Sequence, residues 1–482
     1  MKVIFNFRVW LMLGLFAGII ALQLSAESSF AQNSEEEVGI DSTQTYLPLM
    51  VNRYPWVTSF GSQIKYLTNP EIANFAQDAG LNWARIDAFN WAEIEPVNTN
   101  ASGYNWSSVD ETTLRVANER GMKVIAVVRG TPSWAQKVQP YTCGPVKEAA
   151  LADFAEFIKD LVKRYKEYPY HIEYWELGNE PDVVYSPELG YDSVFGCWGD
   201  ASQTYYGGEY YAQMLNVIYP AIKSVDPDAK VLIGGLLQDC DPTFDKTCHT
   251  GKFFEGILRN GINQRGDNFD IVSFHGYVPY SGSSKGLQFD EHNPKWEHRG
   301  GAVLGKVDFL RFVMGKYGIS KPIIHTEAAL LCPEYNVTDC ANPDHRFYES
   351  QADYVIWLFV RNWVNGVLST IWFTFDGPDW RFGSLLDETQ TPKPAYNALK
   401  FLTQELNSAS YSKRVLENTS VAGYEFTTND KKIWVLWSPD ESTHTVTFSS
   451  TAKKAFDKYG TEISITGNQI TVNNPVYVEF SR

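Results

Sequence analysis

The chain has 482 residues, of which 44% are hydrophobic and 20% are charged, and this balance excludes a mostly disordered protein. Its formal net charge of -16 gives a surface that repels phosphate, which excludes general nucleic-acid binding and makes acidic polymers poor substrates. Aromatic residues make up 15% of the chain, enough for a large core and for surfaces on which rings can stack.

The N-terminus has the pattern of a secretory signal peptide. Lys2 and Arg8 precede an uncharged apolar run over residues 9–22, which is short for a bilayer-spanning helix. Small residues then stand where a signal peptidase cleaves. We predict a signal peptide over residues 1–31, a linker and N-terminal segment over 32–53, and a secreted protein that is free of the membrane after cleavage. An uncleaved membrane anchor is the alternative.

Short apolar strands alternate with amphipathic helices between residues 54 and 408. The predicted strands cover residues 57–60, 83–89, 123–128, 172–177, 230–236, 270–274, 322–326 and 370–375. The predicted helices cover residues 71–79, 110–120, 147–165, 210–222, 253–259, 303–314, 351–364 and 394–406. Eight such units predict an α/β fold whose parallel sheet closes into a (β/α)8 or TIM barrel, and an open parallel sheet is the alternative.

After residue 408 the hydrophobic pattern changes to the alternation typical of antiparallel strands. The predicted strands cover residues 421–427, 432–438, 443–448, 463–466, 469–472 and 476–480. We therefore expect a catalytic barrel domain over residues 54–408. A small, β-sandwich-like accessory domain follows it over residues 409–482 and packs against it.

The chain contains six cysteines, and an even number in an exported protein indicates disulfide bonds. Fifteen pairings are possible in principle. No Cys-x-x-Cys spacing is present, which argues against a metal site. Two pairs would each close a short loop, and this leaves one long-range pair. The expected bridges are Cys240–Cys248, Cys332–Cys340 and Cys143–Cys197.

Two glutamates follow predicted strands at points where a barrel carries its catalytic residues. Glu180 comes after the fourth strand in Gly178-Asn179-Glu180-Pro181, and Glu327 comes after the seventh. Pro181 restricts Glu180, so we expect an extended backbone there. A pair of carboxylates on one barrel face is what glycoside hydrolysis requires. For either glutamate alone, a solvated or salt-bridged residue is the alternative.

These motifs resemble those of the retaining (β/α)8 glycoside hydrolases of clan A. The Gly178-Asn179-Glu180-Pro181 run resembles the acid/base motif of that clan, and Thr326-Glu327 resembles its nucleophile position. Trp372 stands where the clan has a strand-eight tryptophan. The segment around Trp134 is similar to the loop after strand three in glycoside hydrolase family 39 and its relatives.

The resemblance implies a role for each matching residue. Glu327 is the expected nucleophile, and Glu180 is the expected acid/base, with its pKa raised by the charge of Glu327. Asn179 is expected to hydrogen-bond the sugar 2-hydroxyl. Arg85 is expected to bind the nucleophile carboxylate, and membership of a salt-bridge network at the barrel mouth is the alternative.

Four further side chains are expected to bind substrate. His275 and Tyr277 alternate along the sixth strand, so both can face the nucleophile or the sugar. Trp372 is expected to form a stacking floor for a pyranose ring, and Trp134 is a further cleft residue. The alternative for each is a buried core side chain.

The sequence thus predicts a retaining β-glycosidase that hydrolyses β-linked polysaccharides or oligosaccharides by double displacement. Long loops carrying aromatic residues favour an endo-acting enzyme; these residues are Tyr185, Tyr191, Trp198, Phe244, Tyr280 and Trp296. An exo-acting β-xylosidase-type enzyme, a transglycosylase and a non-catalytic carbohydrate-binding protein are the alternatives.

The predicted partner is a carbohydrate, and no cofactor or metal ion is expected. Residues 300–306 have Walker A spacing, but Val307 replaces the hydroxyl residue that would hold magnesium. His292 and His298 are a weak alternative metal site, and a substrate-side loop is preferred for them.

Overall fold

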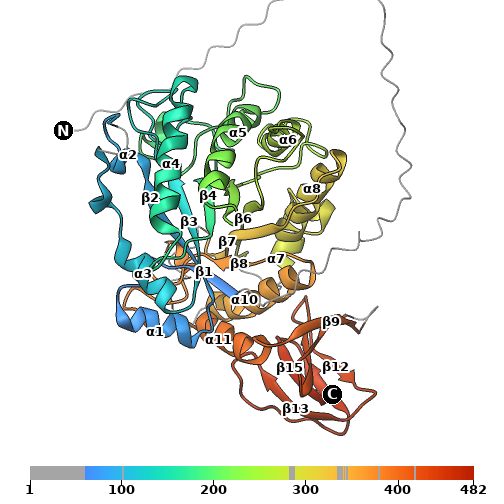
Figure 1. Ribbon diagram of the computed structural model, residues 1–482. Coiled ribbons are helices and arrows are strands. Elements are labelled where there is room, and N and C mark those ends of the chain that lie inside the picture. The colour runs from blue at the N-terminus through green and yellow to red at the C-terminus, as the bar shows by residue number, and fades with distance from the viewer. Residues whose placement is uncertain are drawn as a thin grey trace, which may run out of the picture. The chain divides into compact units, whose positions relative to one another are not determined.

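Eight parallel strands and the helices between them form a barrel in the computed structural model of this chain (Figure 1). The residues that it describes are 60–99, 103–281, 288–333, 340, 342, 346–377, 380–416 and 420–482. The predicted signal peptide over 1–31 and the linker over 32–53 lie outside the described residues.

The barrel strands pair in the order β5-β4-β3-β2-β1-β8-β7-β6. Isolated parallel bridges from Leu232 to Ile271 and from Leu236 to Phe274 close the sheet between β5 and β6. This confirms the predicted barrel over the open sheet. The strands are β1 (Phe60–Gln63), β2 (Trp83–Asn90), β3 (Lys123–Arg129), β4 (Tyr174–Asn179), β5 (Lys230–Gly235), β6 (Val272–Pro279), β7 (Ile323–Leu331) and β8 (Thr370–Trp372).

Helices surround the strands (Figure 1), and some of them begin at a side chain that caps the first backbone N–H groups. In the first helix, Asn69 accepts a hydrogen bond from the Glu71 N–H, and Pro70 occupies a position that needs no donor. The described helices are α1 (Pro70–Asp78), α2 (Trp91–Ile94), α3 (Glu111–Glu119), α4 (Leu151–Tyr165), α5 (Gly208–Val225), α6 (Lys252–Arg259), α7 (Gln288–Glu291), α8 (Ala302–Lys316), α10 (Arg346–Val364) and α11 (Pro394–Leu406). None of the helices in the described part of the chain is long and apolar enough to cross a membrane.

Side chains alternate between the inside of the barrel and the helix layer along each strand. One buried cluster fills the interior with one residue from most strands: Trp83, Ile125, Leu232, Ile271, Ile324 and Ile371. Their sequence neighbours pack outward against the helices. The residues at the strand ends that point inward, above this cluster, therefore form the floor of the catalytic face.

The C-terminal part consists of antiparallel strands, as predicted. A five-stranded sheet has the order β13-β15-β11-β10-β9, and β12 pairs with β14. The strands are β9 (Ser410–Val415), β10 (Ala422–Thr427), β11 (Lys431–Trp437), β12 (His444–Thr447), β13 (Ala452–Asp457), β14 (Gln469–Val472) and β15 (Val476–Ser481). The strand predicted over 463–466 is wrong, and β9 and β13 were not predicted because they are largely polar and exposed.

The C-terminal strands pack on the last two barrel helices. Phe426 of β10 lies 4.7 Å from Trp363 of α10, measured between ring centroids. The Lys458 ammonium lies 2.7 Å from a carboxylate oxygen of Asp353 on α10, and both residues are buried. All the described residues belong to one compact unit.

Three disulfides are present with the expected pairing. Cys143–Cys197 ties the loop after β3 to the loop after β4, Cys240–Cys248 closes a turn after β5, and Cys332–Cys340 follows β7. All three lie on the side of the barrel where the strands end, so they brace the loops around the candidate site.

Candidate active site

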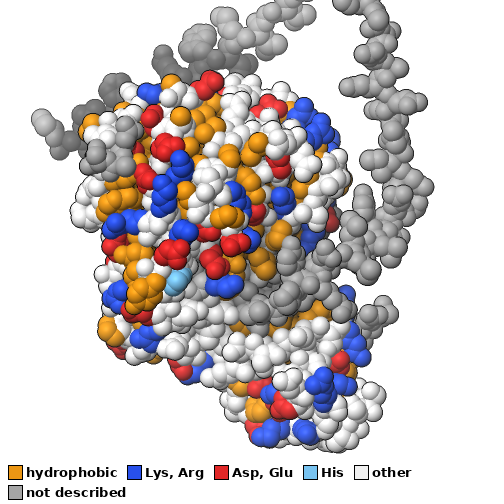
Figure 2. Space-filling view, in the orientation of Figure 1, with side chains coloured by type: hydrophobic (Ala, Val, Ile, Leu, Met, Phe, Trp, Pro, Cys, Tyr) orange, Lys and Arg blue, Asp and Glu red, His pale blue; other side chains and the backbone are white. Residues whose placement is uncertain are grey.

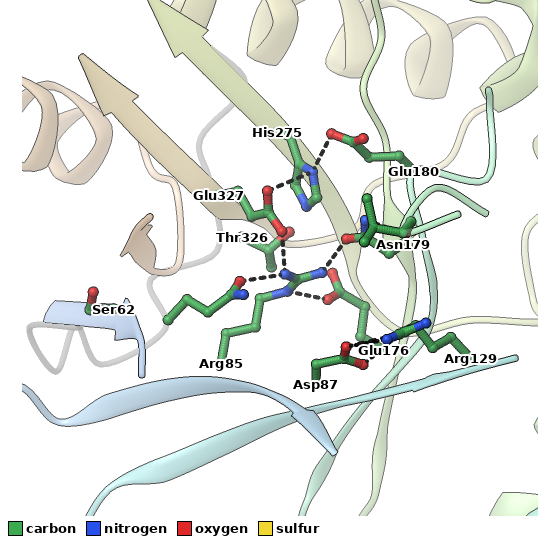
Figure 3. Close-up of polar contacts among 12 residues, drawn as sticks. Ser62, Arg85, Asp87, Arg129, Glu176, Asn179, Glu180, His275, Thr326 and Glu327 are labelled. Carbon is green, nitrogen blue, oxygen red and sulfur yellow. Dashed lines mark hydrogen bonds and ion pairs between the residues drawn. The ribbon is translucent and has the colours of Figure 1, made fainter. Parts of the chain in front are cut away.

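Glu180, directly after β4, and Glu327, within β7, meet beside His275 of β6 (Figure 3). One side-chain oxygen or nitrogen from each of the three residues lies within 4.8 Å of the others. The carboxylates are thus close enough to act on one bond from two sides.

The backbone at Glu180 is not extended, so that prediction is wrong. Gly178 has φ 96° and Glu180 has φ 47°, which is left-handed backbone that costs a non-glycine residue about 1–3 kcal/mol. The Glu180 N–H donates to the carbonyl of Gly235 at 3.0 Å, which holds this turn against β5. The turn carries the Glu180 side chain back over the barrel mouth.

Two donors surround the Glu327 carboxylate. The Arg85 guanidinium donates to one oxygen, and the Tyr277 hydroxyl donates to the other. Burial and the charge of Glu327 raise the pKa of Tyr277 well above its usual value, so this hydroxyl keeps its proton and donates. Together the two contacts fix the position of the carboxylate.

Glu180 has a different environment. Its Oε1 lies 2.8 Å from His275 Nδ1, and the side chain is buried. Burial raises the pKa of Glu180 to about 7, against the positive charges of Lys306 and Arg85. The expectation that the charge of Glu327 supplies this shift is wrong, because removal from water is its cause.

His275 joins the two carboxylates. Its Nδ1 lies 2.8 Å from Glu180 and 3.4 Å from Glu327 Oε2, and burial lowers the pKa of His275 to about 4. Because both neighbours are acceptors, we assign the proton of the neutral ring to Nδ1. The ring fits only because residue 235 is glycine, since a Cβ there would lie 2.0 Å from His275 Nε2.

Arg85 serves several partners at once. Its Nε donates to Glu176 at 2.6 Å, one Nη donates to Gln63 at 2.8 Å, and the other donates to Asn179 Oδ1 at 2.7 Å. Burial works against its charge, yet the carboxylates of Glu176 and Glu327 raise the pKa of Arg85. Arg85 therefore takes part in a buried network as well as binding Glu327.

Sequence reasoning missed three parts of this site. Glu176 and Gln63 point into the barrel. The alternation of side chains along a strand is the sequence signal that could have indicated this. Lys306 of α8 is buried, and its Nζ donates to the carbonyls of Leu237 at 2.7 Å and His275 at 2.9 Å. Its Walker-like spacing gave no indication of this role.

Trp372 does not line the site, and the prediction of a stacking floor there is wrong. Ile371 fills the barrel interior, so Trp372 points outward; it is fully buried, and its Nε1 donates to the Gly383 carbonyl at 2.8 Å. Phe373 and Trp380 lie beside the site instead, with ring centroids 5.6 Å and 5.5 Å from that of Tyr277.

Trp134 is half-buried, and the structure gives it a packing role. Its Nε1 donates to the Glu95 carbonyl at 3.0 Å, and its ring lies 5.3 Å from that of Trp91. The six loop aromatics divide evenly: Trp198, Tyr280 and Trp296 are buried, whereas Tyr185, Tyr191 and Phe244 are exposed.

Within the described residues, Glu180, His275 and Glu327 are also the one group whose geometry suits a metal ion. The Arg85 charge against Glu327 opposes a cation there. The alternative site at His292 and His298 has no support, since His298 Nε2 is bonded to Asp241 at 2.9 Å.

Three comparisons with known proteins bear on this site. The model of the family described as cellulase (glycosyl hydrolase family 5) matches residues 35–302. No curated protein matches the chain.

Solved structures resemble this one over most of its length. A family 39 glycoside hydrolase from the gut symbiont Bacteroides cellulosilyticus WH2 has a TM-score of 0.63 at 17% identity, covering 87% of this chain and 80% of that chain. A GH30 endoxylanase from Clostridium papyrosolvens C71 has a TM-score of 0.56 at 13% identity, covering 89% of this chain and 97% of that chain. A monomeric beta-xylosidase from Caulobacter crescentus CB15 has a TM-score of 0.56 at 15% identity, covering 88% of this chain and 96% of that chain. At these sequence identities, the structural similarity shows the fold of this chain and nothing further.

Proposed function

Because the chain belongs to the cellulase family, glycosyl hydrolase family 5, and is thus a clan A glycoside hydrolase, we propose that it is a secreted retaining β-glycosidase. Glu180 is its acid/base and Glu327 its nucleophile. The observation that carries the proposal is the closeness of these two carboxylates, whose side-chain oxygens lie within 4.8 Å. Inverting enzymes separate the pair by about 6.5–9.5 Å, and retaining enzymes by about 5–5.5 Å.

In the first step, a Glu327 oxygen attacks the anomeric carbon while Glu180 gives its proton to the leaving oxygen. The glycosidic bond breaks, and a glycosyl ester of Glu327 forms. In the second step, Glu180 takes a proton from water, whose oxygen attacks the same carbon and releases Glu327. Two inversions leave the product with the configuration of the substrate.

Neighbouring side chains support this cycle. Arg85 and Tyr277 hold the Glu327 carboxylate in position for the attack. Neutral His275 donates its Nδ1 proton to Glu180 Oε1, which leaves the other oxygen to carry the catalytic proton. Asn179, whose Oδ1 accepts from Arg85, lies beside Glu180 and is proposed to bond the sugar 2-hydroxyl.

NMR of the first product tests this proposal. We expect an aryl β-glycoside to release the β-anomer first, followed by mutarotation. Initial release of the α-anomer would show inversion and exclude the double displacement.

We further propose that the substrate is a neutral, β-linked glycan cut internally. Acidic and basic side chains are interspersed over the side of the barrel seen in Figure 2, and the formal net charge of -16 opposes an acidic polymer, which favours an uncharged substrate. Exposed aromatics on the loops, Tyr185, Tyr191 and Phe244, favour several bound sugars over one. A rapid fall in viscosity of soluble xylan or β-glucan, with oligosaccharides of mixed length, supports endo attack. Monosaccharide as the sole early product indicates an exo-acting β-xylosidase-type enzyme instead.

Export is proposed on the signal-like N-terminus and on three disulfides, which persist in oxidising compartments. Sequencing the N-terminus of the protein recovered from the culture medium tests it. We expect the mature chain to begin at Gln32, and a protein that retains residues 1–31 in the cell membrane would favour the anchor.

A further inference from the structure

Three tyrosines form a group on the loops after β3 and β4. Tyr141 is buried, and its ring centroid lies 5.1 Å from that of Tyr185 and 5.3 Å from that of Tyr191. The two outer side chains are 42% and 59% exposed. We call Tyr185 and Tyr191, backed by Tyr141, the tyrosine platform.

The platform is held by covalent and hydrogen bonds. The Thr142 N–H donates to the Tyr191 carbonyl at 2.9 Å, and the Thr142 hydroxyl donates to Asp192 at 2.9 Å. The Cys143–Cys197 disulfide joins the two loops next to these contacts. A surface that is ordered before binding loses little conformational freedom when a ligand binds.

A short stretch of chain links the platform to the residue that precedes Glu180. Asn179, which precedes Glu180, donates from Nδ2 to the Val194 carbonyl at 3.0 Å. Val194 is three residues beyond Tyr191, so this stretch of chain spans at most about 10 Å. A cavity lined by Asn179, Val194, Thr142 and Arg129 lies along the same path.

The border of this path is polar and acidic, since the carboxylates of Asp87, Asp192 and Glu93 all act on the guanidinium of Arg129. Arg129 Nε donates to both carboxylate oxygens of Asp87 at 2.8 Å, and both side chains are partly exposed (Figure 3). The paired charges leave donors and acceptors for hydroxyl groups without attracting an anion. Exposed aromatic rings beside such groups suit a neutral sugar, whose apolar face stacks on a ring while its hydroxyls bind polar side chains.

We propose that the tyrosine platform is a sugar-binding subsite outside the catalytic centre, in which Tyr185 and Tyr191 stack on sugar units of the chain being cleaved. The inference rests on the proposed function and deepens it, since it makes the substrate a glycan of several units.

The test compares a polymer with a small substrate. The double variant Tyr185→Ala/Tyr191→Ala is assayed on soluble xylan and mixed-linkage β-glucan, and on 4-nitrophenyl β-xyloside and β-glucoside. Each ring is worth a factor of about two to ten. We therefore expect the KM for the polymer to rise at least about fivefold, with kcat retained and the aryl glycosides unaffected. A circular-dichroism melting curve equal to that of the native protein shows that the variant is folded.

Tyr168→Ala is the matched control. Tyr168 is 77% exposed and follows α4, so it lies at the amino end of β4, opposite the catalytic face. We expect this variant to leave the KM for the polymer unchanged.

An unchanged polymer KM in the double variant, or an equal loss on polymer and aryl glycosides, would overturn the subsite. A change of oligomeric state in gel filtration without a change in polymer KM would overturn it in favour of a protein partner. A native protein that cleaves aryl glycosides but no polymer would overturn the subsite while keeping the proposed function. Inactivity of the native protein on all four substrates would instead reject the proposed function.

Discussion

Glu180 and Glu327 are the same residue type, and their neighbours give them different environments. Glu327 accepts hydrogen bonds from a charged guanidinium and a hydroxyl. Glu180 is buried against a neutral histidine, and its pKa rises to about 7. Two carboxyl groups with opposed environments are the arrangement that separates a catalytic acid from a nucleophile.

Removing each carboxyl group should have a different effect. We expect Glu327→Ala to lose almost all activity on every β-glycoside, because no ester can form. Glu180→Ala should be slow on substrates with poor leaving groups but largely spared on 2,4-dinitrophenyl glycosides, whose departure needs no proton. Azide should accelerate this variant by attacking the glycosyl ester, and the glycosyl azide is measured by chromatography. Wild-type turnover by Glu327→Ala would refute the assignment.

The pKa of Glu180 predicts the alkaline limb of the pH profile. The acid must be protonated, so kcat/KM should fall as pH rises through about 7. Lys306 lowers the pKa of Glu180, against the larger effect of burial, so Lys306→Met should move this limb to higher pH. His275, Arg85 and Glu327 also face Glu180 and are unchanged in this variant.

Lys316→Met, on the exposed end of the same helix, is the control and should leave the profile where it was. An alkaline limb that stays fixed in Lys306→Met, with the fold intact, would contradict the electrostatic coupling.

The sequence was sufficient to predict that Glu180 and Glu327 lie close together, because each stands in a recognisable motif on a barrel strand or directly after one. It was not sufficient for Lys306, since the contact with the His275 carbonyl depends on how α8 packs over β6. The backbone of Glu180 differed from expectation for a similar reason. Tertiary contacts hold a left-handed conformation that the local effect of Pro181 disfavours.

At the scale of elements, strand ends decide which side chains reach the substrate. The existence of all eight barrel strands was predictable from apolar runs, but their ends were not. Strand β7 runs to Leu331, beyond the predicted end at 326, because every residue of it is buried. At β8, an inward-facing Ile371 sends Trp372 outward and leaves Phe373 beside Tyr277. A one-residue difference in register exchanges the two faces of a strand.

The Cys143–Cys197 bridge closes a longer stretch of chain than Cys240–Cys248, with separations of 54 and 8 residues. Chain entropy then predicts a loss of about 4 kcal/mol in the free energy of unfolding without the first bridge, and about 2.5 kcal/mol without the second. The double-serine variants, unfolded in guanidinium, measure this difference. Equal losses, or a greater loss for the short loop, would contradict the entropic account.

At the scale of the whole molecule, we propose that residues 54–408 and 409–482 are distinct domains that fold as one unit. The core that contains the barrel helices also includes Phe426, Val435 and Tyr477 from the C-terminal sheet. The predicted strand pattern of residues 409–482 cannot reveal such an interface, because the interface depends on long-range contacts. Deleting residues 409–482 should therefore expose apolar surface on α10 and α11 and yield aggregated protein.

The buried ion pair of Lys458 and Asp353 allows the contribution of this interface to stability to be measured. Lys458→Ala leaves Asp353 buried without its cation, which should lower the free energy of unfolding by about 3–5 kcal/mol. Lys413→Ala, an exposed position on β9, is the control and should change it by less than about 0.5 kcal/mol. If the two parts fold as one unit, we also expect the native protein to unfold in a single transition. Two separate transitions, with Lys458→Ala shifting neither, would show independent domains.

Covalent trapping of the nucleophile tests the central assignment most directly. A 2,4-dinitrophenyl 2-deoxy-2-fluoro-β-glycoside, made from the sugar whose aryl glycoside is cleaved fastest, should form the ester but release it slowly. Mass spectrometry of a peptic digest should then find one fluorosugar on the peptide that contains Glu327. A label on any other residue, or turnover of this reagent without a covalent intermediate, would contradict the account.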